Sequence, residues 1–139
     1  MEAEPDFALH PRLAADTVGL GPLALSAARL MNDARYPWLV LVPRRANLHE
    51  FVELEDGGQS LLLGEIRRCC ELFKALHEPA RINIAMIGNV VPQLHVHVVA
   101  RFTDDATWPR PVWGLGEARP YAPGMLDARV TRYRQFLGV

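Results

Sequence analysis

The segment Gln93-Leu94-His95-Val96-His97-Val98-Val99-Ala100-Arg101 decides the fold, because polar and apolar side chains alternate along it before it becomes wholly apolar. Successive side chains of an extended strand point to opposite faces of a sheet. The alternation predicts a strand with one packed face, and with Gln93, His95 and His97 on a second face that is free for chemistry. The predicted packed face consists of Leu94, Val96, Val98, Ala100 and Phe102. Residues two apart on a strand lie roughly 6.5–7 Å apart along it, so His95 and His97 can address adjacent atoms of one substrate.

A pair of strands is predicted upstream of this segment. Residues 22–31 form an apolar run that is ambiguous between strand and helix. The run ends at Asn32-Asp33, and a strand-like apolar run follows at residues 38–42. This order favours two strands joined by a short polar turn.

Two helices and a further strand are also predicted. Apolar side chains in residues 60–77 recur at the spacing of one helical face, and the same holds for residues 126–137. Residues 81–87 alternate as a strand, and Gly88-Asn89 then turns the chain toward the histidines. The order of elements predicts an α+β fold with a mostly antiparallel sheet of about five strands. We expect one domain over residues 1–139, with a core at about 20–102 and a C-terminal tail at 103–139.

The composition argues against several classes of partner. The formal net charge is −1, and Lys and Arg are spread along the chain, so the sequence lacks the basic surface that binds nucleic acid or an anionic membrane. The apolar runs are too short to cross a membrane, and the acidic start does not resemble an export signal. We therefore expect a cytoplasmic protein. Cys69 and Cys70 are adjacent and lack the spacing of a redox motif, so we expect reduced helix residues.

The histidine segment resembles the histidine triad (HIT) motif, His-φ-His-φ-His-φ-φ with φ apolar, except that Gln93 stands in place of the first histidine. Residues 30–33 and 38–43 resemble the ribose-binding strand pair of that superfamily, and the Gly88-Asn89-Val90 turn also fits. The resemblance covers roughly residues 20–102 and implies a HIT-like fold.

The resemblance implies a nucleotidyl hydrolase or transferase. Its substrate would be a purine nucleoside phosphate derivative, such as a dinucleoside polyphosphate or a nucleoside phosphoramidate, cleaved at the α-phosphate bond. His95 matches the family's nucleophile, which forms a transient nucleotidyl-histidine, and His97 matches the histidine that hydrogen-bonds phosphate oxygens or the leaving group. The resemblance further implies that Asn32 or Asp33 binds the ribose hydroxyls. It also implies that His95 and the phosphate are oriented by Asn83, Asn89 and the backbone near Val90. Residues 108–114 resemble a Trp-Pro element that lies near the partner's site in dimeric relatives, so we expect a homodimer.

The residues themselves are compatible with this chemistry. Imidazole has an ordinary pKa near 6.5, so it is a nucleophile near neutral pH without a cofactor or a metal. His95 then needs an acceptor for its other ring nitrogen, for which we expect a backbone carbonyl. Gln93 can donate and accept hydrogen bonds but cannot change its charge, which predicts a structural role within the catalytic segment. Relatives often carry a histidine where this chain has Trp38. With Gln93 and Trp38 in place of two imidazoles, fewer groups can protonate the leaving group, so substrates with good leaving groups such as polyphosphate or acyl phosphate are favoured.

Other interpretations of the histidine pair stay open. His95 and His97 can be ordinary strand residues, or metal ligands of a cupin-like enzyme if a third ligand comes from elsewhere. The chain can also be a nucleotide-binding module with little turnover.

Several single residues have two interpretations. Trp108 and Trp113 can cover the core or form dimer contacts. Arg101 can bind phosphate or be solvated. The remaining histidines lie in no patterned cluster and are interpreted as structural residues. They are His10, His49 and His77.

Overall fold

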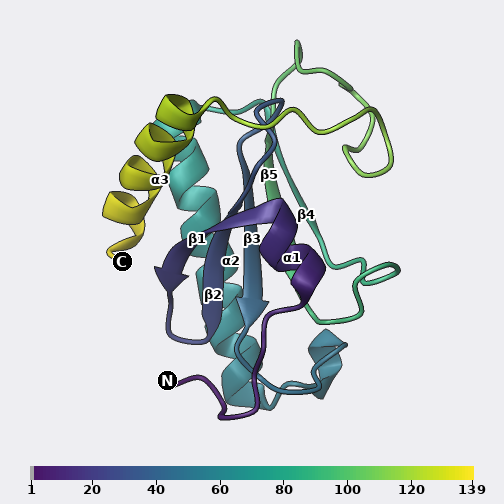
Figure 1. Cartoon of the computed structure of the whole chain (residues 1–139), viewed down its shortest axis with the longest axis vertical. Helices are drawn as coiled ribbons and strands as arrows, with labels where there is room; N and C mark the ends of the chain where they lie inside the picture. Colours follow the sequence, from purple (N-terminus) through teal and green to yellow (C-terminus); the bar gives the residue numbers. More distant parts are fainter. Residues whose placement is uncertain (1) are drawn as a thin grey trace.

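The structure is a computed structural model that describes residues 2–139, and its centre is a five-stranded sheet (Figure 1). The strand order is β1-β2-β3-β5-β4, and every neighbouring pair is antiparallel. The strands are β1 (Thr17–Pro22), β2 (Ser26–Met31), β3 (Trp38–Pro43), β4 (Arg81–Ala85) and β5 (Val96–Arg101). The predicted α+β fold with an antiparallel sheet is confirmed.

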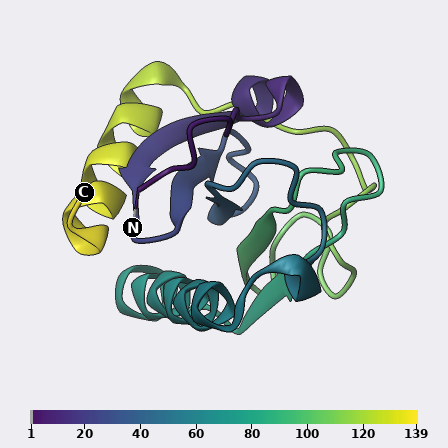
Figure 2. The same ribbon diagram turned by 90° about the horizontal axis from the view of Figure 1, so that it is seen from below.

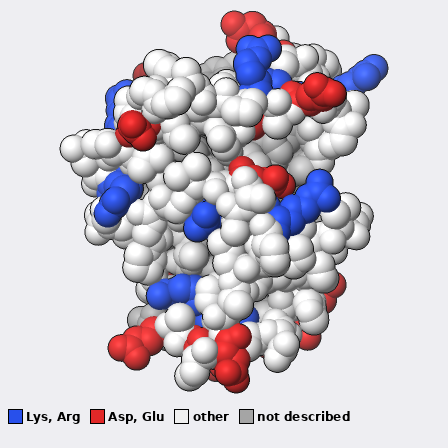
Figure 3. All heavy atoms as spheres, in the orientation of Figure 1, with Lys and Arg blue, Asp and Glu red and all other residues white. Residues whose placement is uncertain are grey.

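Helices lie on both sides of the sheet (Figure 2). The long helix α2 (Asp56–His77) contacts β3 and β5, and α3 (Pro123–Leu137) contacts α2 and β1. The short helix α1 (Pro11–Asp16) lies on the other side, and a 3-10 turn, η1 (Phe51–Glu53), precedes α2. No helix within residues 2–139 is long and apolar enough to cross a membrane. Figure 3 shows acidic and basic side chains interspersed on the face it presents.

The two faces of β5 have the predicted alternation, but neither face is open. Val96, Val98 and Ala100 pack in the cluster beneath α2 and α3. Val99, on the opposite face, packs in a second cluster. This second cluster contains Leu13, Tyr36, Trp38, Val40, Val42, Val91, Val99 and Val112, with Phe7, Leu9, Met31 and Trp113 at its edge. The expectation of a free face is therefore wrong, because the N-terminal segment, α1 and the tail cover it.

The histidine segment is only partly a strand. The β4 ladder reaches Ala85 opposite His97, and the β3 ladder reaches Leu41 opposite Val96. Residues 93–95 therefore belong to the loop that connects β4 to β5, because neither ladder continues beyond Val96 toward them. The predicted strand over residues 81–87 likewise ends early, at Ala85.

Other boundaries differ from the sequence prediction for local reasons. The predicted strand pair exists as β2 and β3, but Pro22 ends a preceding strand, β1, that the prediction missed together with α1. Helix α2 begins at Asp56, so it includes Gly57 and Gly58 and starts four residues before the predicted range of 60–77. A Cβ atom at Gly58 would lie 3.3 Å from Leu54, so glycine permits this close packing at the start of the helix.

Candidate functional site

The site is built around His95 and His97, whose imidazole rings contact each other edge to face. Their centroids lie 4.7 Å apart at an interplanar angle of 74°. Each residue is only 6% exposed. β5 positions His97, and the loop that enters β5 positions His95. The two rings therefore share one small, largely dehydrated environment.

A backbone hydrogen bond fixes the proton of His95. Nδ1 lies 2.7 Å from the carbonyl oxygen of Gln93, and a carbonyl can only accept, so Nδ1 carries the hydrogen. This is the predicted acceptor, and it leaves the lone pair of Nε2 available. Burial lowers the pKa of His95, the bond to Gln93 raises it, and the charge of His10 lowers it, with a net decrease. His95 is therefore neutral over a wider pH range than a free imidazole.

His97 is fixed in the opposite tautomer. The indole Nε1–H of Trp38 donates to its Nδ1 over 3.0 Å, so a neutral ring carries its hydrogen on Nε2. Burial, with a smaller contribution from His95, lowers the pKa of His97 to about 3. Trp38 and Trp113 contact the ring edge to face, with centroids 5.6 and 5.5 Å away. His97 is thus a neutral hydrogen-bond donor at physiological pH.

Both outward nitrogens remain available. Within residues 2–139, the buried side-chain nitrogen and oxygen atoms that are sealed from solvent without a hydrogen bond are Ser26 Oγ and Trp113 Nε1. Nε2 of His95 and Nε2 of His97 are not among them, and neither has a hydrogen-bond partner in the part of the chain that the structure describes. The site therefore offers one free lone pair and one free N–H group side by side, which suits attack on phosphorus and donation to its oxygen.

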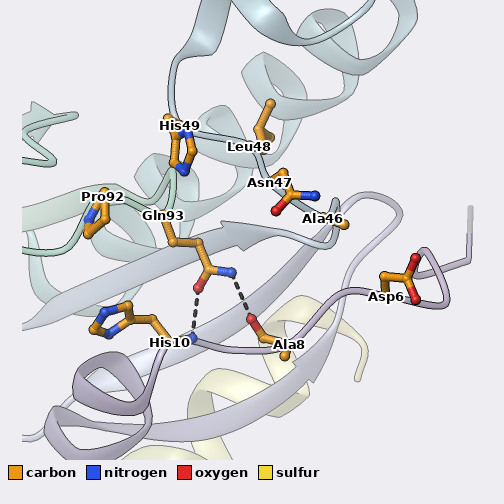
Figure 4. Close-up of a pocket in the computed structure, with 9 residues that line it drawn as sticks. All are labelled: Asp6, Ala8, His10, Ala46, Asn47, Leu48, His49, Pro92 and Gln93. Atoms are coloured by element: carbon orange, nitrogen blue, oxygen red, sulfur yellow. Dashed lines mark hydrogen bonds between the residues drawn. The ribbon is translucent and has the colours of Figure 1, made fainter.

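Gln93 uses its side chain to hold the N-terminal segment (Figure 4). Its Nε2 donates to the carbonyl of Ala8 over 2.8 Å, and its Oε1 accepts from the backbone N–H of His10 over 2.9 Å. Gln93 and His10 line a cavity of about 280 Å³ together with Asp6, Asn47 and His49. His95 and His97 do not line this cavity. It is formed where the N-terminal segment faces the loop that follows β3.

The residues predicted to bind ribose are engaged by the protein itself. Asp33 is 1% exposed and accepts hydrogen bonds from Arg35 and from the backbone of Arg119. Burial alone raises the pKa of Asp33, but the bonds from Arg35 outweigh it and lower the pKa overall. Asn32 accepts from the backbone of Tyr121 over 2.9 Å. In this structure both side chains hold the C-terminal tail against β2.

Asn83 and Arg101 form a buried structural network. Arg101 is 1% exposed, donates to Asn83 Oδ1 over 2.9 Å, and pairs with both carboxylate oxygens of Asp105. Arg101 is therefore neither solvated nor free for phosphate, and Asn83 supports it. Asn89 and Val90 lie exposed in the loop between β4 and β5.

The aromatic residues of the tail contact their own chain. Trp113 packs against Trp38 and His97, and the Arg101 guanidinium lies 5.7 Å from the Trp108 ring. Trp113 therefore covers the second cluster, and Trp108 packs against the buried Arg101. His77 is also a packing residue, because its Nε2 hydrogen-bonds the Tyr133 hydroxyl over 2.7 Å.

Metal and thiol chemistry find little support in the described part of the chain. Residues 2–139 contain no group of three His, Cys, Asp or Glu placed to hold a metal ion. Cys69 and Cys70 are free, and burial raises the pKa of Cys69 to about 12. A thiol of this kind is inert near neutral pH.

Two contacts of the site, those of His10 with Gln93 and of Trp38 with His97, were not predicted from the sequence. His10 lies 83 positions before Gln93, and only the N-cap position ahead of Pro11 marks it in the sequence. Trp38 lies 59 positions before His97. Trp38 reaches His97 because it pairs with Val99 in the ladder between β3 and β5. The sequence alone does not specify this pairing.

Comparisons with known proteins agree with this architecture. The HIT domain model matches residues 14–104. A histidine triad protein from Bradyrhizobium japonicum is 41% identical, with a TM-score of 0.93 over 96% of this chain and 99% of that chain. A histidine triad (HIT) protein from Sinorhizobium meliloti is 42% identical, with a TM-score of 0.90 over 94% and 96%. One from Marinobacter aquaeolei is 39% identical, with a TM-score of 0.92 over 95% and 96%. No curated protein matches the chain.

The family match includes all five strands, α2 and both histidines of the site. The likeness to the rhizobial structures extends over nearly the whole chain. This chain belongs to the HIT family.

Proposed function

We propose that this protein is a nucleotidyl hydrolase or transferase that cleaves the α-phosphate bond of a purine nucleoside phosphate derivative through His95. The observation that carries the proposal is the pair of opposite tautomers. His95 presents a lone pair on Nε2, and His97 presents an N–H group on its own Nε2. The centroids of the two rings lie 4.7 Å apart. Family membership supports the reaction class.

The first step forms a bond between His95 Nε2 and the α-phosphorus. The bond from phosphorus to the leaving group breaks, and its electron pair stays on the leaving group, which takes a proton from water. The Nε2–H of His97 donates to a phosphoryl oxygen as charge shifts onto it. Gln93 holds the His95 tautomer through its backbone carbonyl.

The second step releases the nucleotide. A water oxygen, or another acceptor in a transferase, forms a bond to phosphorus, and the electron pair of the phosphorus–nitrogen bond returns to His95 Nε2. The proton of the attacking water passes to solvent. Splitting one displacement into two lowers the barrier of each step. We propose the exposed loop residues Asn89 and Val90 as phosphate contacts, since they lie on the loop that leads into His95.

A substrate panel tests this function. We expect turnover of adenosine 5′-phosphoramidate, a dinucleoside polyphosphate or an aminoacyl adenylate, and mass spectrometry of the quenched enzyme should locate a nucleotidyl group on His95. His95→Ala should reduce turnover to background while circular dichroism shows an intact fold. Wild-type turnover by this variant contradicts the proposed nucleophile.

A binding module with little turnover is the second candidate. The observation that favours it is Gln93 itself, whose amide cannot exchange a proton near neutral pH and whose two polar atoms are both bonded to the backbone. Calorimetric binding of a nucleotide without turnover of any member of the panel would support the module.

We also propose a homodimer that forms through β4. β4 is an edge strand of the sheet, and large apolar side chains are exposed on it and on the following loop. These are Ile84, Met86, Ile87 and Val90. An exposed apolar edge strand is suited to pairing with another chain.

Sedimentation velocity tests the assembly. We expect twice the chain mass of 15.6 kDa for the wild type and a single chain mass for Ile84→Arg. Leu63→Arg is the matched control, because Leu63 is 56% exposed on α2, away from this edge. A wild-type monomer at micromolar concentration would contradict the dimer.

A further inference from the structure

The N-terminal segment places a third imidazole, that of His10, in the cavity beside Gln93, two residues before His95. Gln93 bonds the backbone on both sides of Leu9, at Ala8 and at His10. Phe7 and Leu9 pack at the edge of the cluster that contains Trp38. The segment is therefore fixed by apolar packing and by two hydrogen bonds to one side chain. His10, which sequence reasoning treated as an isolated structural residue, is held beside the site.

The ring of His10 has a defined tautomer and a free donor. Its Nδ1 accepts from the backbone N–H of Arg12 over 3.1 Å at the first turn of α1, so a neutral ring carries its hydrogen on Nε2. That N–H has no partner within residues 2–139, and the ring lines the cavity beside Gln93 (Figure 4). A charge on His10 lowers the pKa of His95. Gln93 links the two residues, because its side chain accepts from the backbone N–H of His10 and its carbonyl accepts from His95 Nδ1.

We propose that His10 binds the substrate: its Nε2–H donates a hydrogen bond to the departing atom of the leaving group, which enters the cavity lined by His10, Asn47 and His49. Gln93 is the positioning residue that holds His10 in place. The inference rests on the function proposed above. His10 transfers no proton in this role. The electron pair of the breaking bond stays on the departing atom, His10 stabilises it there, and water supplies the proton.

The role predicts a dependence on the leaving group. A hydrogen bond stabilises a departing oxygen more when the negative charge is concentrated on it than when the charge is delocalised. Phenolate keeps most of its charge on oxygen, whereas 4-nitrophenolate spreads it over the ring. Loss of the His10 donor should therefore slow cleavage of a phenyl ester much more than cleavage of a 4-nitrophenyl ester.

The experiment compares kcat/KM for phenyl and 4-nitrophenyl esters of adenosine and guanosine 5′-monophosphate. His10→Asn is the main variant, because Asn keeps an oxygen that can accept from Arg12 at the N-cap. We expect a loss on the order of tenfold to a hundredfold with the phenyl ester and less than about threefold with the nitrophenyl ester. Gln93→Met should shift the ratio in the same direction. Asp16→Asn, at the exposed end of α1, is the control and should leave both rates unchanged.

Each outcome decides the assignment. An equal loss with both esters would show that His10 only supports the fold, and no loss with either would show that it does not contact the substrate. Both results overturn the proposal while leaving the nucleophile in place. Failure of the wild type to cleave any of the esters would count against the proposed function itself, and His10 would lose its role with it.

Discussion

At the scale of single residues, the site depends on the position of a few hydrogens. His95 and His97 are both neutral imidazoles, yet one offers a lone pair and the other a donor. The difference comes from their Nδ1 partners, a carbonyl oxygen for His95 and an indole N–H for His97. Neither partner takes part in bond breaking, but together they assign the two roles.

Trp38→Phe tests the tautomer of His97. Phenylalanine keeps an aromatic ring in the cluster but removes the N–H that bonds to Nδ1, so the His97 hydrogen can redistribute between the two nitrogens. We expect kcat to fall roughly fivefold to tenfold, the factor that corresponds to a hydrogen bond of about 1–1.4 kcal/mol. Nitrogen NMR of the imidazole should show the change of tautomer directly. An unchanged spectrum would mean that packing alone holds the ring.

The pH profile tests His95. Its folded pKa lies below the ordinary imidazole value, mainly because of burial. The nucleophile must be neutral, so kcat/KM should rise with pH through an acid limb and then level off. We expect the midpoint of that limb below about 6.5. His97 does not titrate in this range, because its pKa is about 3. A midpoint above 6.5 would contradict the buried, neutral nucleophile.

At the scale of elements, one carboxylate joins the main helix to the sheet. Glu65 of α2 is 7% exposed and accepts from the backbone N–H groups of Leu25 and Ser26, which lead into β2. Backbone N–H groups at the start of β2 thus donate to a side chain of the helix. This contact explains why a polar residue occupies the buried face of α2.

Glu65→Ala should reduce the free energy of unfolding by about 1–3 kcal/mol, because it leaves two backbone donors without a partner. Glu71→Ala, on the same helix, removes only exposed pairs with Arg67 and Arg68 and should cost less than about 1 kcal/mol. Urea denaturation of the two variants under the same conditions provides the comparison. Equal losses would show that the Glu65 bonds add nothing beyond helix propensity.

At the scale of the whole molecule, the sheet separates two hydrophobic clusters that are covered by different parts of the chain. α2 and α3 cover one face. Segments from both ends of the chain cover the other and bury His95 and His97. The protein therefore keeps these two histidines neutral in its interior, and this links its stability to pH.

Stability should fall as the pH decreases below the ordinary imidazole pKa. Above about pH 6.5, His97 is neutral in both the folded and the unfolded chain, so it does not make the free energy of unfolding depend on pH. Below this pH, His97 is protonated in the unfolded chain but stays neutral in the folded chain down to about pH 3. Each such group lowers the unfolding free energy by about 1.4 kcal/mol per pH unit. His77, whose pKa burial lowers to about 4, adds a smaller term because it is only half-buried.

Urea denaturation at pH 7, 6 and 5 measures this slope. In His97→Gln, the slope should decrease by about one proton, since the glutamine cannot titrate. An identical slope in the variant and the wild type would contradict the burial of a neutral His97.

The local order of residues specifies the pattern on which the site is built. Strict alternation in residues 93–98 predicts the two histidines on one face, because successive side chains of an extended chain point to opposite sides. Helical spacing predicted α2, and apolar runs around a polar turn predicted β2 and β3. The family motif then followed from residue types alone. All of these features are local, so neighbouring residues suffice to specify them.

The tertiary structure decided what each histidine can do. The indole that fixes His97 and the N-terminal segment that Gln93 holds both come from distant parts of the chain. The closure of the histidine face, and the engagement of Asn32 and Asp33 by the tail, also depend on such contacts. A hydrogen bond between residues far apart in sequence leaves no periodic signal, because its partners meet only after the sheet has formed. Residue types set the available chemistry, and the long-range contacts set which nitrogen carries the hydrogen.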